Sequence, residues 1–497
     1  MLQRILKNAG RDALLYFPVK LIPALTSLIT VPLFTRMIDP ADYGYFYSIT
    51  ATTSLALAFT QGWITSSAVR YFWIARRENT SDAYAATTLW LTLAMLTLGS
   101  LVVGGAVWLA RPLMDPGLAR LVPMGIAAYW ASGLFAVLLQ VLRAANRARP
   151  YAILSTTMTL VTTGIAVWLV WQRDTGSLGI LIGSVVGHAV LIPFGIYQIG
   201  REGSLAPKDA SRDYVREFFS YGMPLTIAGM SGWALVLADR YVLLAFRTAA
   251  EVGVYSVAYG LGDKIMQLII APMLMTIGPM LIQTYEQHGQ ELAEQTQTQF
   301  TRYFLMTTLP LLTGMAVAGP DFMATFTGPK YQEAASILWL VSAGATANGL
   351  AQIAGAGLGL HKRSAIIMQN SLFSALFNVG INLLTVPRFG YPAAAVNTLL
   401  SYVLLLTLTW YRTRPYMAWR LPVADLMRVV AACAAMGAVV WFAFPGAVDS
   451  VWLLLAQAGV GLVLYVAALL LMGGVKPAER AWIMHGIRTK VLRRGGE

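Results

Sequence analysis

The chain has 497 residues and a formal net charge of +13, and hydrophobic residues make up 57% of it against 12% charged residues. A soluble domain usually carries about 25% charged residues, so a soluble protein of this length is excluded. The single cysteine, Cys433, excludes a disulfide framework, and the 4 histidines are too scattered for a zinc site. Neither a Walker-type phosphate loop nor a Gly-rich dinucleotide fingerprint occurs, so no cofactor and no metal is expected.

Apolar segments long enough to cross a bilayer, about 20 residues each, recur along the whole chain. The first follows a basic N-terminus and is longer than the apolar core of a secretory signal, so we expect it to be a retained span. The sequence therefore predicts an all-α polytopic membrane protein with about 14 transmembrane helices. The predicted spans lie at 12–35, 45–67, 84–110, 118–141, 151–172, 177–199, 218–245, 253–282, 300–319, 333–359, 364–386, 391–411, 425–445 and 451–473.

The basic residues are distributed unevenly between the two sides of the membrane. When both termini are placed in the cytoplasm, most of the 36 Lys and Arg residues fall in inner segments. This positive-inside distribution predicts a multi-pass protein of a bacterial or archaeal cytoplasmic membrane with both termini cytoplasmic. The outer loops are short, which argues against a membrane glycosyltransferase or ligase with an external active site.

Two halves of the chain can be aligned with each other. The segment ADYGYF at 41–46 matches AEVGVY at 250–255, and further along Gly176 matches Gly390. These matches join equivalent span boundaries, so each half holds six predicted spans that start on the inner side. The repeat predicts two parallel six-helix lobes around a central cavity, followed by two extra C-terminal helices.

The repeat also predicts the domain organisation. The predicted parts are an N-lobe over 1–200, a cytoplasmic linker over 201–217, a C-lobe over 218–411, two further spans within 412–473 and a basic cytoplasmic tail over 474–497. Apolar residues recur at helical spacing in the tail. We therefore expect it to form an amphipathic helix on the anionic inner leaflet.

Charged residues inside the predicted spans are the first candidates for a functional site. Burying a charge in a bilayer costs at least ~2.5–3.5 kcal/mol, so these side chains are expected to face a wet cavity or one another. They are Lys20, Asp239, Arg240, Asp263 and Lys264.

Two interpretations of these charges remain open at this stage. Ion pairs between the seventh and eighth spans are one, for example Asp239 with Lys264 or Arg240 with Asp263. The other is a cationic cavity that binds phosphate or pyrophosphate, with Asp239 or Asp263 as the site of a coupling ion, Na⁺ or H⁺. The residues of that predicted substrate site are Lys20, Arg70, Arg240 and Lys264.

Prolines interrupt the first span of each half. Pro18 and Pro23 lie in the first span and Pro224 lies in the seventh. Because broken helices at equivalent positions line the cavity in repeat transporters, we interpret these prolines as candidate hinges.

Several segments of the chain resemble the polysaccharide-type flippases of the multidrug/oligosaccharidyl-lipid/polysaccharide (MOP) exporter superfamily. The resemblance covers roughly 10–410 of the numbering. It rests on PLFTRMIDPADYGYFYS at 32–48, SAVRYF at 67–72, LLQVLRAANRARPYA at 138–152, ADRYVLLAFRTAAEVGVYSVAY at 238–259 and TGPKYQEAASILWL at 327–340.

The resemblance implies a Wzx-type flippase rather than an enzyme. Such a protein moves an undecaprenyl-pyrophosphate-linked oligosaccharide from the inner to the outer leaflet by alternating access. Lys20, Arg240 and Lys264 would correspond in kind to the cationic cavity of the family. The implied partners are this lipid-linked glycan, membrane lipids and the polysaccharide polymerase or glycosyltransferase machinery, with no nucleic acid.

Other transporters remain alternatives. A drug or metabolite antiporter of the related MATE type has the same six-plus-six lobes, but a cationic drug would favour an acidic cavity. A lipid II flippase is a sister branch, and the first span here has only Lys20 where that branch has a fuller set of arginines.

Overall fold

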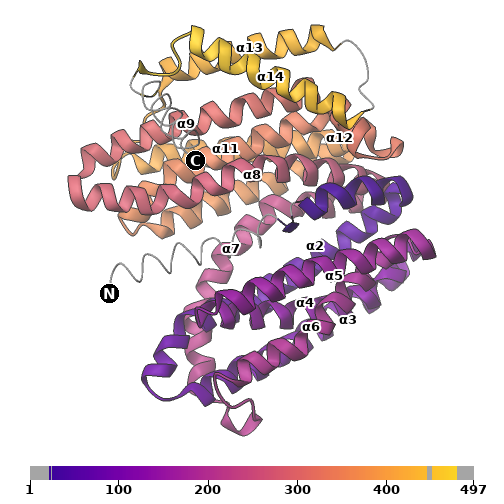
Figure 1. The fold of residues 1–497 in the computed structure, drawn as a ribbon. Helices are drawn as coiled ribbons and strands as arrows, with labels where there is room; N and C mark the ends of the chain where they lie inside the picture. The colour runs from indigo at the N-terminus through magenta and orange to yellow at the C-terminus, as the bar shows by residue number, and fades with distance from the viewer. Residues whose placement is uncertain (1–21, 24, 445–449, 478, 480–497) are drawn as a thin grey trace, which may run out of the picture. The chain divides into compact units, whose positions relative to one another are not determined.

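A computed structural model describes residues 22–23, 25–444, 450–477 and 479 (Figure 1). These residues are helical almost throughout, and no β-strand occurs among them. Ten of the described helices are long and apolar enough to cross a membrane, or eleven if a bent pair counts as one span. The chain is an all-α polytopic membrane protein, as the sequence predicts.

The chain divides into two compact units, which are described separately. The first unit contains the described residues up to 257 together with 326–333 and 371–398. The second contains 258–325, 334–370 and the residues from 399 onward. The predicted lobes, linker and tail follow the repeat along the chain, and their boundaries stay a prediction.

The first unit is a bundle in which α2 contacts α4 and α7, and α5 contacts α6. Cap residues set two of its helix starts. Asp115 accepts a hydrogen bond from the backbone N–H of Gly117 at 2.8 Å, and Ser211 accepts one from Asp213 at 3.2 Å. The elements are the helix Leu25–Met37, α2 (Pro40–Arg77), α3 (Ser81–Ala110), η1 (Arg111–Leu113), α4 (Pro116–Ala144), α5 (Ala148–Arg173), α6 (Ser177–Gly200), η2 (Pro207–Asp209), α7 (Arg212–Phe246), the start of α8 (Ala249–His288), part of η3 (Pro329–Ile337) and the middle of α12 (Ser364–Thr413).

The second unit holds the remaining helices, and α13 and α14 lie side by side in it (Figure 1). A short helix that the sequence did not predict, α10, is bent by 73° from the end of α9. The elements are the rest of α8, α9 (Gln290–Val317), α10 (Gly319–Phe326), the rest of η3, α11 (Leu338–Leu360), the two ends of α12, α13 (Val423–Ala443) and α14 (Val451–Leu471).

The predicted spans agree with these helices. Every predicted span after the first overlaps a helix, and α12 contains two of them because Gly390, at φ 67°, breaks its helical geometry. The first predicted span, 12–35, lies partly outside the described residues. Its described part belongs to the helix Leu25–Met37.

The predicted cytoplasmic linker is docked on the first unit. The backbone N–H of Ser204 donates to Asp82 at 2.6 Å, and the indole of Trp90 donates to the carbonyl of Leu205 at 2.9 Å, so the segment is fixed to α3. Glu202 is buried and forms ion pairs with two arginines, one at the end of α2 and one before α5. The segment connects α6 to α7, and these polar contacts fix it to α2, α3 and the residue before α5.

Arg302 of α9 ties the segment after α14 to the second unit. Its side chain is 1% exposed and contacts two carboxylates, Asp425 at 3.3 Å and Glu479 at 3.0 Å, and it also donates to the carbonyl of Gly474 at 2.6 Å. The hydrogen bond from Arg302 lowers the pKa of Glu479 to about 2. The rest of the predicted tail helix lies outside the described residues.

We expect Glu479→Gln to destabilise the folded protein by roughly 1–3 kcal/mol, because a hydrogen-bonded buried guanidinium loses a charged partner. Thermal unfolding of the purified protein at pH 7 measures the effect. The lowered pKa means that the contribution of Glu479 is complete above its ordinary pKa and is lost as the pH falls toward 2. The difference between wild type and variant should therefore shrink in acid.

Glu286→Gln is the matched control, because Glu286 is exposed near the end of α8. It should unfold as the wild type does at every pH. Equal unfolding temperatures for Glu479→Gln and Glu286→Gln at pH 7 would show that the segment after α14 is not anchored through Arg302.

Candidate functional site

Two charged neighbours are buried in the first unit, near the end of α7. Asp239 is 1% exposed and Arg240 is 5% exposed. The Arg240 guanidinium donates to the Asp239 carboxylate at 3.1 Å and to the carbonyl of Val236 at 2.7 Å. The backbone N–H of Arg240 donates to the same carboxylate at 2.9 Å. The pair is therefore a compact, nearly neutral unit inside a membrane helix.

Tyrosines surround this pair. The hydroxyl of Tyr255, on α8, donates to the second carboxylate oxygen of Asp239, and the Arg240 guanidinium lies 5.6 Å from the centre of the Tyr255 ring. On α2, Tyr47 lies close enough to Arg240 for an electrostatic interaction. A cation over an aromatic face and a hydroxyl on the carboxylate both stabilise the charged forms in a site from which water is largely excluded.

A ladder of buried asparagines on α12 continues the polar site. The side chain of Thr398 lies near the hydroxyl of Tyr255. Asn378 donates to Thr398 at 3.5 Å and accepts from Asn382 at 3.1 Å, and Asn382 accepts from Asn397 at 2.8 Å. All four of these α12 side chains are at most 3% exposed. A continuous polar track thus runs from Arg240 into both arms of the broken helix.

The ion pair that the structure records is Asp239 with Arg240, which differs from the inter-helix pairs considered from the sequence. Arg70 is exposed on α2. In the second unit Lys264 is exposed on α8, and Asp263 is half-buried and accepts a hydrogen bond from Gln267 at 3.2 Å. The role of each predicted site residue stays a prediction.

The predicted hinge residues are described only in part. Lys20 and Pro18 lie outside the described residues. Pro23 is exposed at the start of the described chain. Pro224 lies inside α7, which continues through it.

The sequence repeat appears in the first unit as a reciprocal contact between the starts of α2 and α8. A Cβ atom added to Gly44 would overlap the carbonyl of Ala249, and one added to Gly253 would overlap the carbonyl of Pro40. Each such atom would also lie 3.0 Å from the backbone nitrogen of the other glycine. The two glycines are matched residues of the repeat, so the two helices meet through equivalent backbone surfaces.

A second pair of equivalent contacts flanks this crossing. Asp42 accepts from the backbone N–H of Ser177 at 2.8 Å, and Glu251 accepts from the backbone N–H of Tyr391 at 3.3 Å. The residues before those donors are Gly176 and Gly390, with φ of 59° and 67°. Each carboxylate thus caps a helix start that follows a left-handed glycine, and the aligned glycines of the sequence have the same structural role.

Two of the quoted sequence motifs also meet in the first unit. The backbone N–H of Gly328 donates to Thr35 at 3.0 Å, and the hydroxyl of Tyr331 donates to the carbonyl of Ile38 at 2.9 Å. The turn that contains TGPKY is therefore fixed to the connection between the first helix and α2.

Comparison with known proteins decides the family. The model described as polysaccharide biosynthesis protein matches residues 9–285, more than half of the chain. The chain belongs to this family. The resemblance to the MOP superfamily drawn from the sequence motifs is thereby confirmed.

Two curated relatives are distant. The "Probable low-salt glycan biosynthesis flippase Agl15" of Haloferax volcanii is 22% identical over 218 residues, which is 44% of this chain and 45% of that protein. This chain therefore spans less than half the length of that relative. The "Uncharacterized membrane protein MJ1068" of Methanocaldococcus jannaschii is 22% identical over 431 residues, covering 81% of this chain and 82% of that protein.

Solved structures share the fold of this chain. Lipid II flippase MurJ in an inward closed conformation has a TM-score of 0.73 at 13% identity, over 93% of this chain and 98% of that one. An inward-facing multidrug resistance MATE family transporter of the MOP superfamily has a TM-score of 0.64 at 14% identity, over 80% of this chain and 97% of that one. At these identities the likeness shows the fold alone.

The sequence pointed to Asp239 and Arg240 in this family member but not to their neighbours. Tyr255 and the α12 side chains were missed because uncharged residues are common in membrane helices. The sequence does hold one indication of this buried polar site: two asparagines, at 378 and 382, lie one helical turn apart in an otherwise apolar span. They lie on one helix face and are costly to bury without partners.

Proposed function

We propose that this polysaccharide biosynthesis protein flips a polyprenyl-pyrophosphate-linked oligosaccharide, a repeat unit of a surface polysaccharide, from the inner to the outer leaflet. The carrier is undecaprenyl pyrophosphate, and transport proceeds by alternating access of two six-helix lobes. The observation that carries the proposal is the buried Arg240, paired with Asp239 on a membrane helix of a polysaccharide biosynthesis family member. The name of the relative Agl15, a probable glycan flippase, supports it.

The chemistry of Arg240 suits a pyrophosphate. A guanidinium offers a planar fork of N–H donors that matches phosphate oxygens in a bidentate contact. Its present acceptors include a carboxylate and a backbone carbonyl. A pyrophosphate group that reaches Arg240 competes with Asp239 for the same donors, while Lys20, Arg70 and Lys264 supply further positive charge along the route.

The same competition links transport to an ion. When phosphate takes the Arg240 donors, Asp239 loses its counter-charge and binds H⁺ or Na⁺ instead. Ion and phosphate binding are then positively coupled, and each raises the affinity for the other. Asp263 is the second candidate for this role.

The proposal places the protein in the cytoplasmic membrane of a bacterium or archaeon, with both termini in the cytoplasm. This orientation rests on the positive-inside distribution of Lys and Arg. Membrane lipids surround the protein, and the glycosyltransferases that assemble the glycan and the polymerase that consumes it are the expected neighbours in function.

Cells that lack this gene are expected to accumulate polyprenyl-linked oligosaccharide and to lose the surface polysaccharide. The reason is that a glycan assembled on the inner leaflet has no other route to the outer surface. Extraction of lipid-linked glycans and assay of surface polysaccharide in the same cells measure both effects. Re-expression of the wild-type chain is the control and should reverse them.

The same experiment tests the alternative functions. Unchanged lipid-linked and surface glycans, together with new sensitivity to cationic compounds, would replace the flippase with a MATE-like antiporter. A block in peptidoglycan precursors would instead indicate a lipid II flippase.

A further inference from the structure

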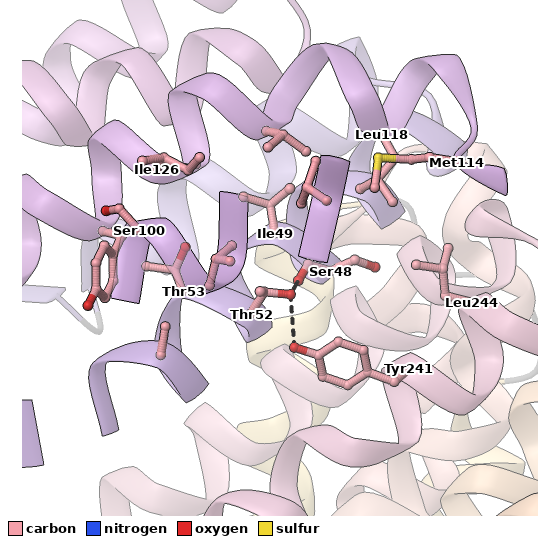
Figure 2. A pocket seen from close by; sticks show the side chains of 16 residues that line it. Ser48, Ile49, Thr52, Thr53, Ser100, Met114, Leu118, Ile126, Tyr241 and Leu244 are labelled. Carbon is pink, nitrogen blue, oxygen red and sulfur yellow. Dashed lines mark hydrogen bonds between the residues drawn. The ribbon is translucent and has the colours of Figure 1, made fainter. Parts of the chain in front are cut away.

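A cavity of about 260 Å³ lies inside the first unit, among α2, α3, α4 and α7 (Figure 2). Its walls come from the ends of these helices that adjoin the connections at 36–42, 111–115 and 247–248. The charge distribution predicts those connections on the outer side, so the cavity lies at the depth of the outer leaflet. The lining residues used below are Ser48, Thr52, Ser100, Val103, Tyr129 and Tyr241.

The cavity walls favour an apolar occupant. No lining residue is charged. Several polar groups on the walls are already hydrogen-bonded: Thr52 and Tyr241 share a hydrogen bond of 2.9 Å, visible in Figure 2, and Ser48 donates to the carbonyl of Gly44 at 2.9 Å. Ser100 accepts from Trp130 at 2.8 Å, and Tyr129 shares a bond of 2.9 Å with Thr60. A polar ligand would find these groups already engaged.

The size of the cavity fits a short stretch of hydrocarbon. An engineered apolar cavity of about 150 Å³ binds benzene, which has six carbon atoms. By proportion this cavity accommodates about ten carbon atoms, the content of two isoprene units.

The cavity and the charged site lie at the same level of two helices, α2 and α7. Tyr47, which interacts with Arg240, is followed directly by Ser48 of the cavity wall, and Arg240 is followed directly by Tyr241. A lipid whose pyrophosphate is at Arg240 would have its first chain segments at the level of this cavity.

We propose that this cavity holds the first two isoprene units of the substrate's polyprenyl chain. The inference rests on the proposed function for the identity of the lipid. It assigns to α2, α3, α4 and α7 a tail-binding site, so that the headgroup and the adjoining chain are recognised by one unit.

The test uses the purified full chain in lipid nanodiscs and a polyprenyl phosphate with a diazirine on its second isoprene unit. Photolabelling followed by peptide mapping should place the label on the lining helices. Val103→Phe fills the cavity and should reduce this labelling at least tenfold. Val102→Phe is the matched control, because the neighbouring side chain is 64% exposed and does not line the cavity.

The outcomes separate this inference from the proposed function. Labelling elsewhere, or equal labelling of Val103→Phe and Val102→Phe, would overturn the inference even if the protein flips glycans. Competition by excess dioleoyl phosphatidylglycerol as effective as by unlabelled polyprenyl phosphate would make the cavity a general acyl-chain site and also overturn it. Labelling as expected, without flipping of lipid-linked oligosaccharide in liposomes, would support the site and contradict the function.

Discussion

Replacing Arg240 by alanine is expected to abolish transport and to destabilise the folded protein by about 3–5 kcal/mol. The substitution leaves the carboxylate of Asp239, which is 1% exposed, without its counter-charge. It also removes the bidentate donor that the proposed pyrophosphate contact needs. Thermal unfolding of the purified protein and flipping of lipid-linked oligosaccharide in liposomes measure the two effects.

The double variant Asp239→Asn with Arg240→Gln separates stability from function. It keeps a hydrogen-bonding side chain at both positions and removes both charges, so most of the lost stability should return while transport stays absent. Arg240→Lys keeps the charge but not the planar fork and should retain only weak transport. Full transport by the double variant would show that the pair is a structural ion pair alone.

The location of this site could be predicted from the sequence, but the hydrogen-bond and ion-pair partners within it could not. A charge in an apolar span is costly, which singled out Asp239 and Arg240. Adjacent residues on a helix point in different directions, so partners were sought on the next helix. The long arginine side chain instead turns back toward Asp239 and the carbonyl of Val236. Such a turn depends on the side-chain conformation that the local packing selects.

The fold was more predictable than the site because span length and hydropathy suffice for it. The predicted spans after the first all overlap helices, and the aligned Gly176 and Gly390 have the same left-handed geometry. The 73° bend into α10 was not predictable. An eight-residue helix at the end of a span has neither the length nor the periodicity that marks a span.

The repeat accounts for two pairs of equivalent contacts in the first unit. One pair is the carboxylate caps, Asp42 on Ser177 and Glu251 on Tyr391. The other is the close approach of the two matched glycines. The matched segments carry a carboxylate at equivalent positions, Asp42 and Glu251, and a glycine two residues later. The equivalent glycines, Gly44 and Gly253, meet where α2 and α8 approach each other in the first unit. The crossing of α2 and α8 is therefore a place where a single substitution acts on both halves.

Gly253→Ala is expected to destabilise the protein by at least about 3 kcal/mol, the upper end of the usual range for overpacking. The added methyl group meets the backbone of Pro40 and Gly44 rather than a movable side-chain end. Relief requires separating α2 from α8. Because the contact is reciprocal, Gly44→Ala should have a similar effect, and the double variant should lose less than the sum, since the helices separate only once.

Gly104→Ala is the matched control, because it adds the same methyl group and is expected not to destabilise the protein. No atom lies within 4 Å of a Cβ added at Gly104, on α3, so alanine should leave stability unchanged or raise it by about 0.4–1 kcal/mol through the unfolded chain. Thermal unfolding of the three single variants and the double variant tests the geometry. Fully additive losses would mean that the two glycines lie in separate contacts. A Gly253→Ala variant as stable as Gly104→Ala would mean that the helices do not meet there, and the pseudo-symmetric crossing of α2 and α8 would have to be abandoned.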